Sequence, residues 1–154
     1  MVECYIAQNE ADWLKGQGRK TRMQQATGTF EVKLVPQKAD NAQAEAAGLG
    51  RMALDKQFLG ALEAVGQGEM LSILDREKGS GGYVAMERVT GTLDGRKGSF
   101  ILQHDATMNR GEAEMNIVVV PDTGTGQLAG ISGSMTVKID GGQHYYYFDY
   151  SLEG

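Results

Sequence analysis

The segment that decides the fold is residues 81–108, with the sequence GGYVAMERVTGTLDGRKGSFILQHDATM. Apolar and polar residues alternate on both sides of Asp94 and Gly95, as they do in half-buried β-strands. An Asp-Gly pair between two such runs predicts a hairpin, because its tight turn needs residues that tolerate positive φ. A single hairpin is not stable in water, so the rest of the chain must complete a sheet around it.

Six further strands are predicted on either side of this hairpin. They are runs of period-two alternation or short apolar runs, separated by Gly, Asn, Asp and Pro residues that form turns. The eight expected strands are 26–36, 51–65, 69–75, 81–93, 96–108, 112–120, 135–139 and 143–152. Residues 37–50 are polar and small, and we interpret them as a loop with a short helical turn.

Residues 51–65, RMALDKQFLGALEAV, fit two structures. Their helix propensity is good throughout, yet most of their large apolar residues share one parity, as in a strand. We interpret the segment as a strand, because Gly66, Gln67 and Gly68 then form a turn into residues 69–75. A helix is the alternative.

Eight antiparallel strands with short connections predict an all-β fold that either stacks as a sandwich or closes into a barrel. Closure alone removes exposed strand edges, so we expect an eight-stranded antiparallel up-and-down β-barrel. The interior of such a barrel is either filled by side chains or holds one small ligand. The barrel domain is predicted over residues 23–154, preceded by an irregular N-terminal arm, residues 1–22, that lacks the alternation.

Composition argues against several classes of function. A net charge of −5 and scattered basic residues argue against binding to nucleic acid or anionic lipid. Cys4 is the only cysteine, so an internal disulfide or a cysteine-based metal cluster is not possible. No apolar run has the length of a membrane span or a signal peptide. We therefore expect a cytoplasmic protein without metal or cofactor; the GxGxxxG pattern at 124–130 lacks the helix that dinucleotide binding requires.

Long stretches of the chain resemble an uncharacterised bacterial family, a domain of unknown function grouped with the allene-oxide-cyclase-like β-barrels. The resemblance covers about residues 24–152 and rests above all on GSFILQHDATM, residues 98–108, and DTGTGQLAGISG, residues 122–133. It implies an eight-stranded barrel with a small apolar cavity, often in a homo-oligomer. Catalytic residues of the cyclases do not align with this chain, so the resemblance implies no reaction.

Polar residues that share a strand face with apolar residues are the candidates for a pocket. The candidate ligand-binding residues are Glu87, His104, Lys56, Tyr83 and Tyr146. A carboxylate in an apolar cavity is expected to have a raised pKa and could act as an acid or a base. A neighbouring His or Lys could orient it or polarise a carbonyl group.

A purely structural interpretation of the same residues is also open, and it is the one that we favour. In it, Glu87 pairs with Lys56 or Arg88 to fix the strand register, and His104 is a hydrogen-bonded core residue. Lys56 then extends outward along apolar surface.

Three functions therefore compete. The first is a small-molecule-binding barrel whose cavity takes an apolar or amphipathic ligand. The second is an isomerase- or cyclase-like enzyme with Glu87 and His104 as acid and base. The third is a structural or interaction protein that oligomerises through its outer strand faces. The sequence identifies neither a ligand nor a reaction.

Overall fold

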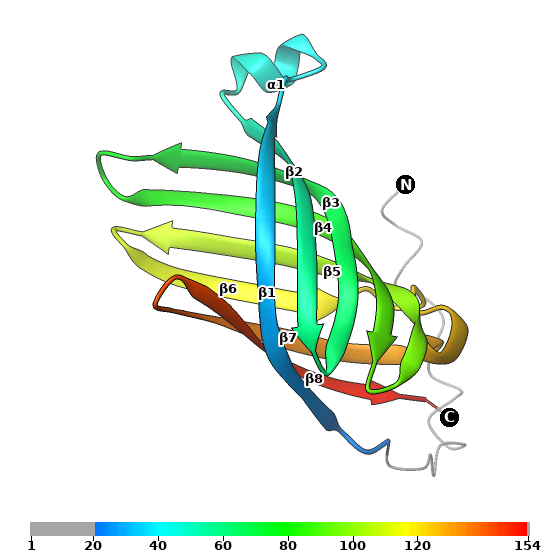
Figure 1. The fold of residues 1–154 in the computed structure, drawn as a ribbon. Coiled ribbons are helices and arrows are strands. Elements are labelled where there is room, and N and C mark those ends of the chain that lie inside the picture. Colours follow the sequence, from blue (N-terminus) through cyan, green and yellow to red (C-terminus); the bar gives the residue numbers. More distant parts are fainter. Residues whose placement is uncertain (1–20, 154) are drawn as a thin grey trace, which may run out of the picture.

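The structure, a computed structural model, describes residues 21–153. In this part of the chain eight strands form a closed barrel, in which each strand pairs antiparallel with its neighbours in sequence and β1 pairs with β8 (Figure 1). The predicted fold class is confirmed. The predicted N-terminal arm, residues 1–22, lies almost entirely outside the described residues.

The strands are long and the connections between most of them are short. Their bounds are β1 (Gln24–Gln37), β2 (Gly50–Gly60), β3 (Leu62–Asp75), β4 (Ser80–Leu93), β5 (Arg96–Asn109), β6 (Glu112–Val119), β7 (Ile131–Asp140) and β8 (Gln143–Leu152). The short helix α1 (Ala42–Ala46) lies in the loop between β1 and β2, where a helical turn was predicted. A 3₁₀ turn, η1 (Gly126–Leu128), precedes β7. No helix within residues 21–153 has the length and apolar character needed to cross a membrane.

The hairpin of β4 and β5 is confirmed and is paired along its whole length, from Gly81 opposite Met108 to Leu93 opposite Arg96. Its turn residues Asp94 and Gly95 have φ values of 45° and 82°, the conformation that made this pair a hairpin signal.

Residues 51–65 are extended and not helical, as predicted, but they do not form one strand, and the predicted turn at residues 66–68 is wrong. The chain reverses at Gly60 rather than at Gly66–Gly68. Gly60 has a φ of 108°, and a Cβ atom there would lie 2.8 Å from the carbonyl oxygen of Thr27, so this turn requires glycine. Gly66 and Gly68 lie instead inside β3, where Gly66 faces the side chains of Glu87 and Phe58 and Gly68 lies against the backbone of Met86.

The hydroxyl of Tyr146 on β8 holds this turn in place. It accepts a hydrogen bond from the backbone N–H of Leu62 at 2.9 Å and donates one to the carbonyl oxygen of Leu59 at 3.0 Å. The hydroxyl of Tyr146 can therefore be buried together with the ring, because the backbone satisfies it both as a donor and as an acceptor.

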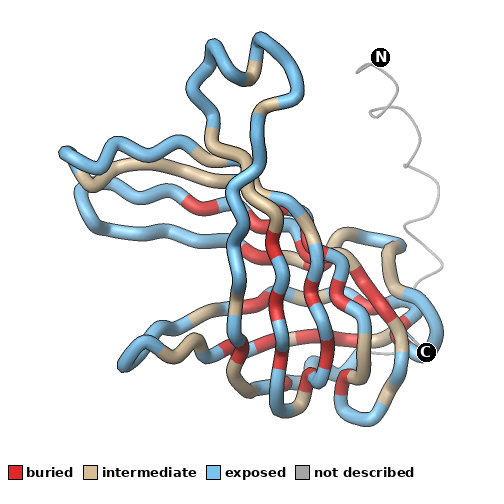
Figure 2. The backbone as a smooth tube through the Cα atoms, turned by 45° about the horizontal axis from the view of Figure 1, so that its top comes forward, coloured by how far each residue is buried: buried red, intermediate tan, exposed pale blue. Residues whose placement is uncertain are grey.

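The two ends of the barrel differ in how they are filled. We call the end with the β2–β3 and β4–β5 turns the packed end, and the end with α1 and the other hairpin turns the open end. The packed end contains the largest fully buried side chains: Phe58, Leu62, Leu93, Phe100, Leu128, Tyr146, Phe148 and Tyr150. Toward the open end the hairpins of β3–β4 and β5–β6 extend beyond the buried region and are exposed (Figure 2).

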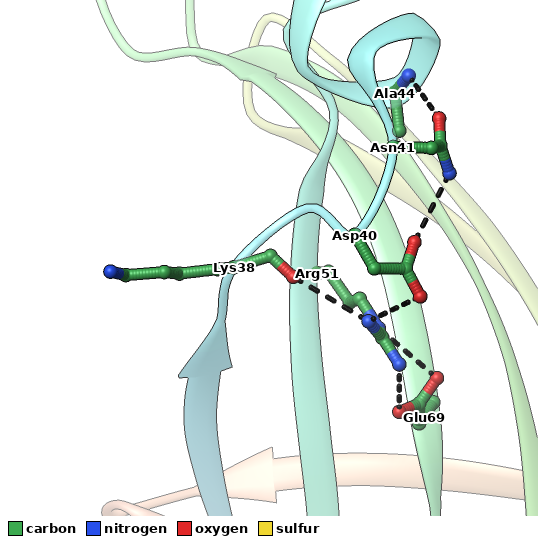
Figure 3. A network of polar contacts seen from close by, with 6 residues as sticks. All are labelled: Lys38, Asp40, Asn41, Ala44, Arg51 and Glu69. Atoms are coloured by element: carbon green, nitrogen blue, oxygen red, sulfur yellow. Dashed lines mark hydrogen bonds and ion pairs between the residues drawn. The ribbon is translucent and has the colours of Figure 1, made fainter.

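A polar network connects the α1 loop to the strands at the open end (Figure 3). The guanidinium of Arg51 on β2 donates two hydrogen bonds to Glu69 on β3, at 2.8 and 3.3 Å, and one to Asp40 at 3.2 Å. Asn41 caps α1 by accepting from the backbone N–H of Ala44 at 2.8 Å. The long β1–β2 connection is thus held to the sheet by side chains, since α1 has no buried residues of its own.

One junction in the barrel wall is much shorter than the others. Strands β6 and β7 are joined at a single residue pair, Val118 and Ser134, whereas every other neighbouring pair of strands is joined at seven or more. From Val118 toward the open end the two strands are not paired with one another. We call this unpaired stretch the β6–β7 seam; its strands are residues 112–117 of β6 and 135–140 of β7.

Candidate functional site

Three ionisable side chains from different strands meet inside the barrel. Lys56 lies on β2, Glu87 on β4 and His104 on β5, each at an inward-facing position of its strand. Strand β3 separates β2 from β4, so contact between Lys56 and Glu87 requires that β3 leave room. Gly66 provides that room, because a Cβ atom at this position would overlap Oε1 of Glu87.

Both basic groups contact the same oxygen of the carboxylate. Nζ of Lys56 is 2.9 Å from Oε2 of Glu87, and Nε2 of His104 is 2.8 Å from it. Glu87 is fully buried, and Lys56 and His104 are only 7% and 3% exposed. We call these three residues the buried cluster.

Electrostatics keep Glu87 ionised. Burial alone would raise the pKa of this carboxyl, but the hydrogen bond with His104 and the positive charge of Lys56 outweigh burial, and the net pKa lies below its ordinary value. The expectation of a raised pKa is therefore wrong, since it took account of the apolar surroundings and not of two basic partners. The Lys56 ammonium also lies 4.9 Å from the centre of the Phe30 ring and 5.6 Å from that of Phe58, which compensates further for its burial.

Lys56 and His104 form the polar part of a cavity of about 240 Å³ inside the barrel. The rest of the lining is mostly apolar and comprises Phe30, Val32, Leu34, Leu54, Met70, Tyr83, Met115, Ile117, Val137, Ile139 and His144. A second apolar hollow of about 280 Å³ lies next to it toward the open end. The two are adjacent and share four lining residues: Leu34, Met70, Tyr83 and Met115.

Three larger hollows, of about 460, 440 and 380 Å³, have a different character. Most of their lining is made of exposed, outward-facing side chains such as Val84, Met86 and Glu31. They are grooves on the outer surface of the barrel, so the interior cavity is the better candidate for a binding site despite its smaller volume.

Four of the five residues predicted for a pocket come together. Lys56, His104 and half-buried Tyr83 line the cavity, while Glu87 lies behind Lys56 and His104 and is not among the lining residues. Tyr146 is not part of this site, because it faces the interior near the packed end and binds the β2–β3 turn. Alternation predicts which face of a strand a residue occupies, but not its height along the barrel.

His144 on β8 was not predicted and lines the same cavity. Its ring centroid lies 4.9 Å from that of Phe30, which in turn faces the Lys56 ammonium. The signal was available, since His144 has the same parity as the buried residues Tyr146 and Phe148. Both histidines of the chain therefore face one cavity.

The fold and this site define a class: an eight-stranded antiparallel β-barrel in which a buried ion-paired cluster lies beneath an apolar cavity. Residues 26–150 match the sequence profile of a family described as "Protein of unknown function (DUF3224)", and the chain belongs to this family. The predicted membership of a family of unknown function is thus confirmed. Its grouping with the allene-oxide-cyclase-like barrels stays a prediction.

A crystal structure of a family member is similar to this chain. It is described as a protein of unknown function from the DUF3224 family of Shewanella oneidensis MR-1, and it is 49% identical, with a TM-score of 0.79. The match covers 86% of this chain and 99% of that chain. No protein of curated function is significantly similar to this sequence.

Proposed function

We propose that the protein binds a small molecule with an apolar body and one polar end inside the barrel. The observation that carries this proposal is the composition of the cavity: its walls are mostly apolar, and Lys56 and His104 lie together within them. Ligand sites commonly combine an apolar lining with a few convergent polar groups that fix orientation.

The chemistry of the buried cluster limits the polar end of the ligand. The Lys56 ammonium has three N–H protons, and one of them is donated to Glu87, so others are free for a ligand. The charges of Lys56 and Glu87 cancel, which favours a neutral hydrogen-bond acceptor over a second buried anion. A carbonyl or hydroxyl oxygen fits best.

The β6–β7 seam supports a route into the cavity. Met115 and Ile117 on β6 and Val137 and Ile139 on β7 line the cavity from the two sides of the seam. Because β6 and β7 are not paired along the seam, the two strands could separate there without breaking backbone hydrogen bonds between them. Met115 adds a flexible apolar side chain that can adapt to a passing ligand.

The first test is to ask what the full chain binds. Mass spectrometry of organic extracts from the purified protein detects a molecule carried from the host, and ligand-observed NMR with medium-chain methyl ketones such as decan-2-one tests binding directly. We expect saturable binding to the native chain. Val137→Trp fills the cavity and should weaken binding at least about tenfold, whereas the matched control Val35→Trp adds the same bulk at an exposed position of β1 and should not. Equal binding by both variants would contradict the proposed location, and no binding of any ketone or co-purified molecule would reject the function.

A second candidate is an isomerase- or cyclase-like enzyme, and a specific contact favours it. Glu87 and His104 lie within hydrogen-bond reach beside the cavity, which meets the geometric requirement for an acid–base pair. Glu87 does not line the cavity, however, so a group that contacts the ligand must be His104 or Lys56 rather than Glu87.

We propose separately that copies of the chain associate through the outer faces of β3 and β4. Leu71, Val84 and Met86 are 44%, 55% and 51% exposed on these strands, and Leu71 pairs directly with Val84. Exposed apolar side chains in contact support an interface. Multi-angle light scattering should show a species larger than 16.6 kDa that Val84→Glu dissociates; a native monomer would rule the interface out.

We also propose that the protein acts in the cytoplasm. This rests on cysteine usage, because a chain whose only cysteine is Cys4 has no internal disulfide to gain from an oxidising compartment. Fractionation of the native host with an antibody against the chain is the direct test.

A further inference from the structure

We propose that the cavity catalyses the reversible enolisation of an apolar ketone or aldehyde, with His104 as the base and Lys56 as the group that stabilises the developing enolate oxygen. This inference rests on the proposed function, since the carbonyl compound must first enter the cavity. It assigns to Glu87 a positioning role rather than a catalytic one.

The hydrogen bonds of Glu87 decide the tautomer of His104. An ionised carboxylate can only accept hydrogen bonds, and Oε2 of Glu87 contacts both Nζ of Lys56 and Nε2 of His104. Nε2 must therefore carry a hydrogen. In the neutral imidazole the other nitrogen, Nδ1, then has a free lone pair and is the base.

Nδ1 of His104 is free and reachable. It makes no hydrogen bond to any side chain or backbone group of residues 21–153. Among the side-chain nitrogen and oxygen atoms of residues 21–153, only Oε1 of Glu87 is both inaccessible to solvent and without a hydrogen-bond partner. Nδ1 of His104 has no partner in this part of the chain, so it must be accessible. Since His104 lines the cavity, we assign Nδ1 as the ring atom that a ligand there reaches.

Lys56 supplies the complementary group. Its ammonium is ion-paired with ionised Glu87, so it acts as a hydrogen-bond donor and positive charge rather than as an amine nucleophile. A donor held in place beside an apolar cavity stabilises negative charge that develops on a carbonyl oxygen. Lys56 and His104 contact the same carboxylate oxygen, so both are held on one side of the cavity, near enough to engage neighbouring atoms of one ligand.

The reaction requires no additional reagent. The C–H bond next to the carbonyl breaks and its proton moves to Nδ1 of His104. The electron pair forms the C=C bond of the enolate, and the carbonyl π electrons move to the oxygen that Lys56 holds. The ionised Glu87 stabilises the imidazolium through Nε2–H, in the orienting role that carboxylates play beside catalytic histidines. The reverse step returns a proton to the same carbon or, where the skeleton allows, to a different one, which is an isomerisation.

Hydrogen–deuterium exchange tests the proton transfer directly. Decan-2-one is incubated with the full chain in D₂O, and ¹H NMR follows the loss of the signals from the carbons next to the carbonyl. We expect the native chain to accelerate exchange about 10²-fold over buffer, within the range of general base catalysis. His104→Gln keeps an N–H donor for Glu87 but removes the base, and should exchange at the buffer rate. Lys33→Met removes an exposed lysine on β1 and should match the native chain.

The remaining variants separate the assigned roles. Lys56→Met should lose most of the acceleration, and Lys56→Arg should retain more because it keeps the positive charge. The native rate should rise with pH to a plateau, a shape absent from His104→Gln. Circular dichroism tests whether each variant is folded. If His104→Gln does not fold, Glu87→Gln provides a second test, since loss of the orienting carboxylate should lower the rate of exchange at unchanged ketone affinity.

Three results would overturn the inference, and they differ from failure of the binding proposal. Ligand-observed NMR that shows decan-2-one bound to the native chain without accelerated exchange leaves a binding protein and removes the chemistry. The assigned base is rejected if His104→Gln catalyses exchange at the native rate. It is also rejected if exchange is lost in His144→Gln but not in His104→Gln. Absence of binding by every carbonyl compound tested rejects the proposed function itself.

Discussion

The buried cluster depends on a residue that takes no part in its chemistry. Gly66 on β3 lies between the strands that carry Lys56 and Glu87, and its missing side chain is the space that the carboxylate occupies. A glycine within a strand normally weakens the strand, because glycine loses more backbone entropy on folding than other residues and has no side chain to pack. Here it allows an ion pair to form across an intervening strand.

Replacement of Gly66 by alanine should therefore be costly. The added Cβ overlaps Oε1 of Glu87, and Glu87 cannot move freely because Lys56 and His104 both hold it. We expect the free energy of unfolding to fall by about 1–3 kcal/mol, as overpacked core sites do. Gly82→Ala is the control on β4, where the nearest atom to the new Cβ would be at 3.3 Å. Chemical denaturation compares the two, and an equal loss in both would contradict the proposed role of Gly66.

Glu87→Gln should change both stability and its dependence on pH. Removing one partner of a buried ion pair leaves the other charge uncompensated, which costs about 3–5 kcal/mol. Because the pKa of Glu87 is lower in the folded than in the unfolded chain, its contribution is complete above the ordinary carboxyl pKa, about 4.3, and is lost as the pH falls through the lowered value.

Urea unfolding at pH 7, 5 and 3.5 measures this effect. The stability difference between the native chain and Glu87→Gln should be similar at pH 7 and 5 and smaller at pH 3.5. Glu114→Gln alters an exposed carboxylate on β6 and should change stability little at any of these values. If the stability difference between the native chain and Glu87→Gln instead grew toward low pH, the pKa of Glu87 in the folded chain would be raised rather than lowered.

At the level of elements, the sequence predicted strands better than turns. The Asp94–Gly95 turn was found because its residues have a local conformational requirement that no tertiary contact overrides. The turn at Gly60 was missed because Gly66–Gly68 is the stronger local signal. What moves the reversal to Gly60 is distant in sequence: the hydroxyl of Tyr146 binds the Gly60 turn, and Gly66 is needed inside β3 for Glu87.

The β6–β7 seam should be the most dynamic part of the barrel wall. Backbone amides exchange slowly where a ladder protects them, and residues 112–117 of β6 have a ladder with β5 only. In hydrogen exchange measured by mass spectrometry, peptides from this part of β6 should take up deuterium faster than peptides from β4, which is paired on both sides. Uptake at the same rate would mean that the seam is closed in solution, and the proposed entry route would then be wrong.

At the scale of the whole molecule, one interior serves two purposes. The packed end contains aromatic side chains in mutual contact, such as Phe100, Phe148 and Tyr150, with ring centroids 5.4–5.5 Å apart. The other half keeps its volume free and holds the charged residues. The sequence could predict the inward faces of Lys56, Glu87 and His104, because alternation is a local property. It could not predict which half each inward residue occupies, since that depends on the stagger of all eight strands.

This division predicts opposite responses to the same substitution in the two halves. Val137 lines the cavity and Val89 is fully buried in the packed core. Val137→Phe should place the added ring in free space and leave the thermal unfolding midpoint unchanged or higher, while reducing ketone binding. Val89→Phe adds the same ring where no space exists, and should lower the free energy of unfolding by about 1–3 kcal/mol. Thermal and urea unfolding of both variants measure the difference. If Val137→Phe is destabilised as much as Val89→Phe, the cavity side is already filled in solution, and a barrel packed throughout its length could not bind a ligand inside it.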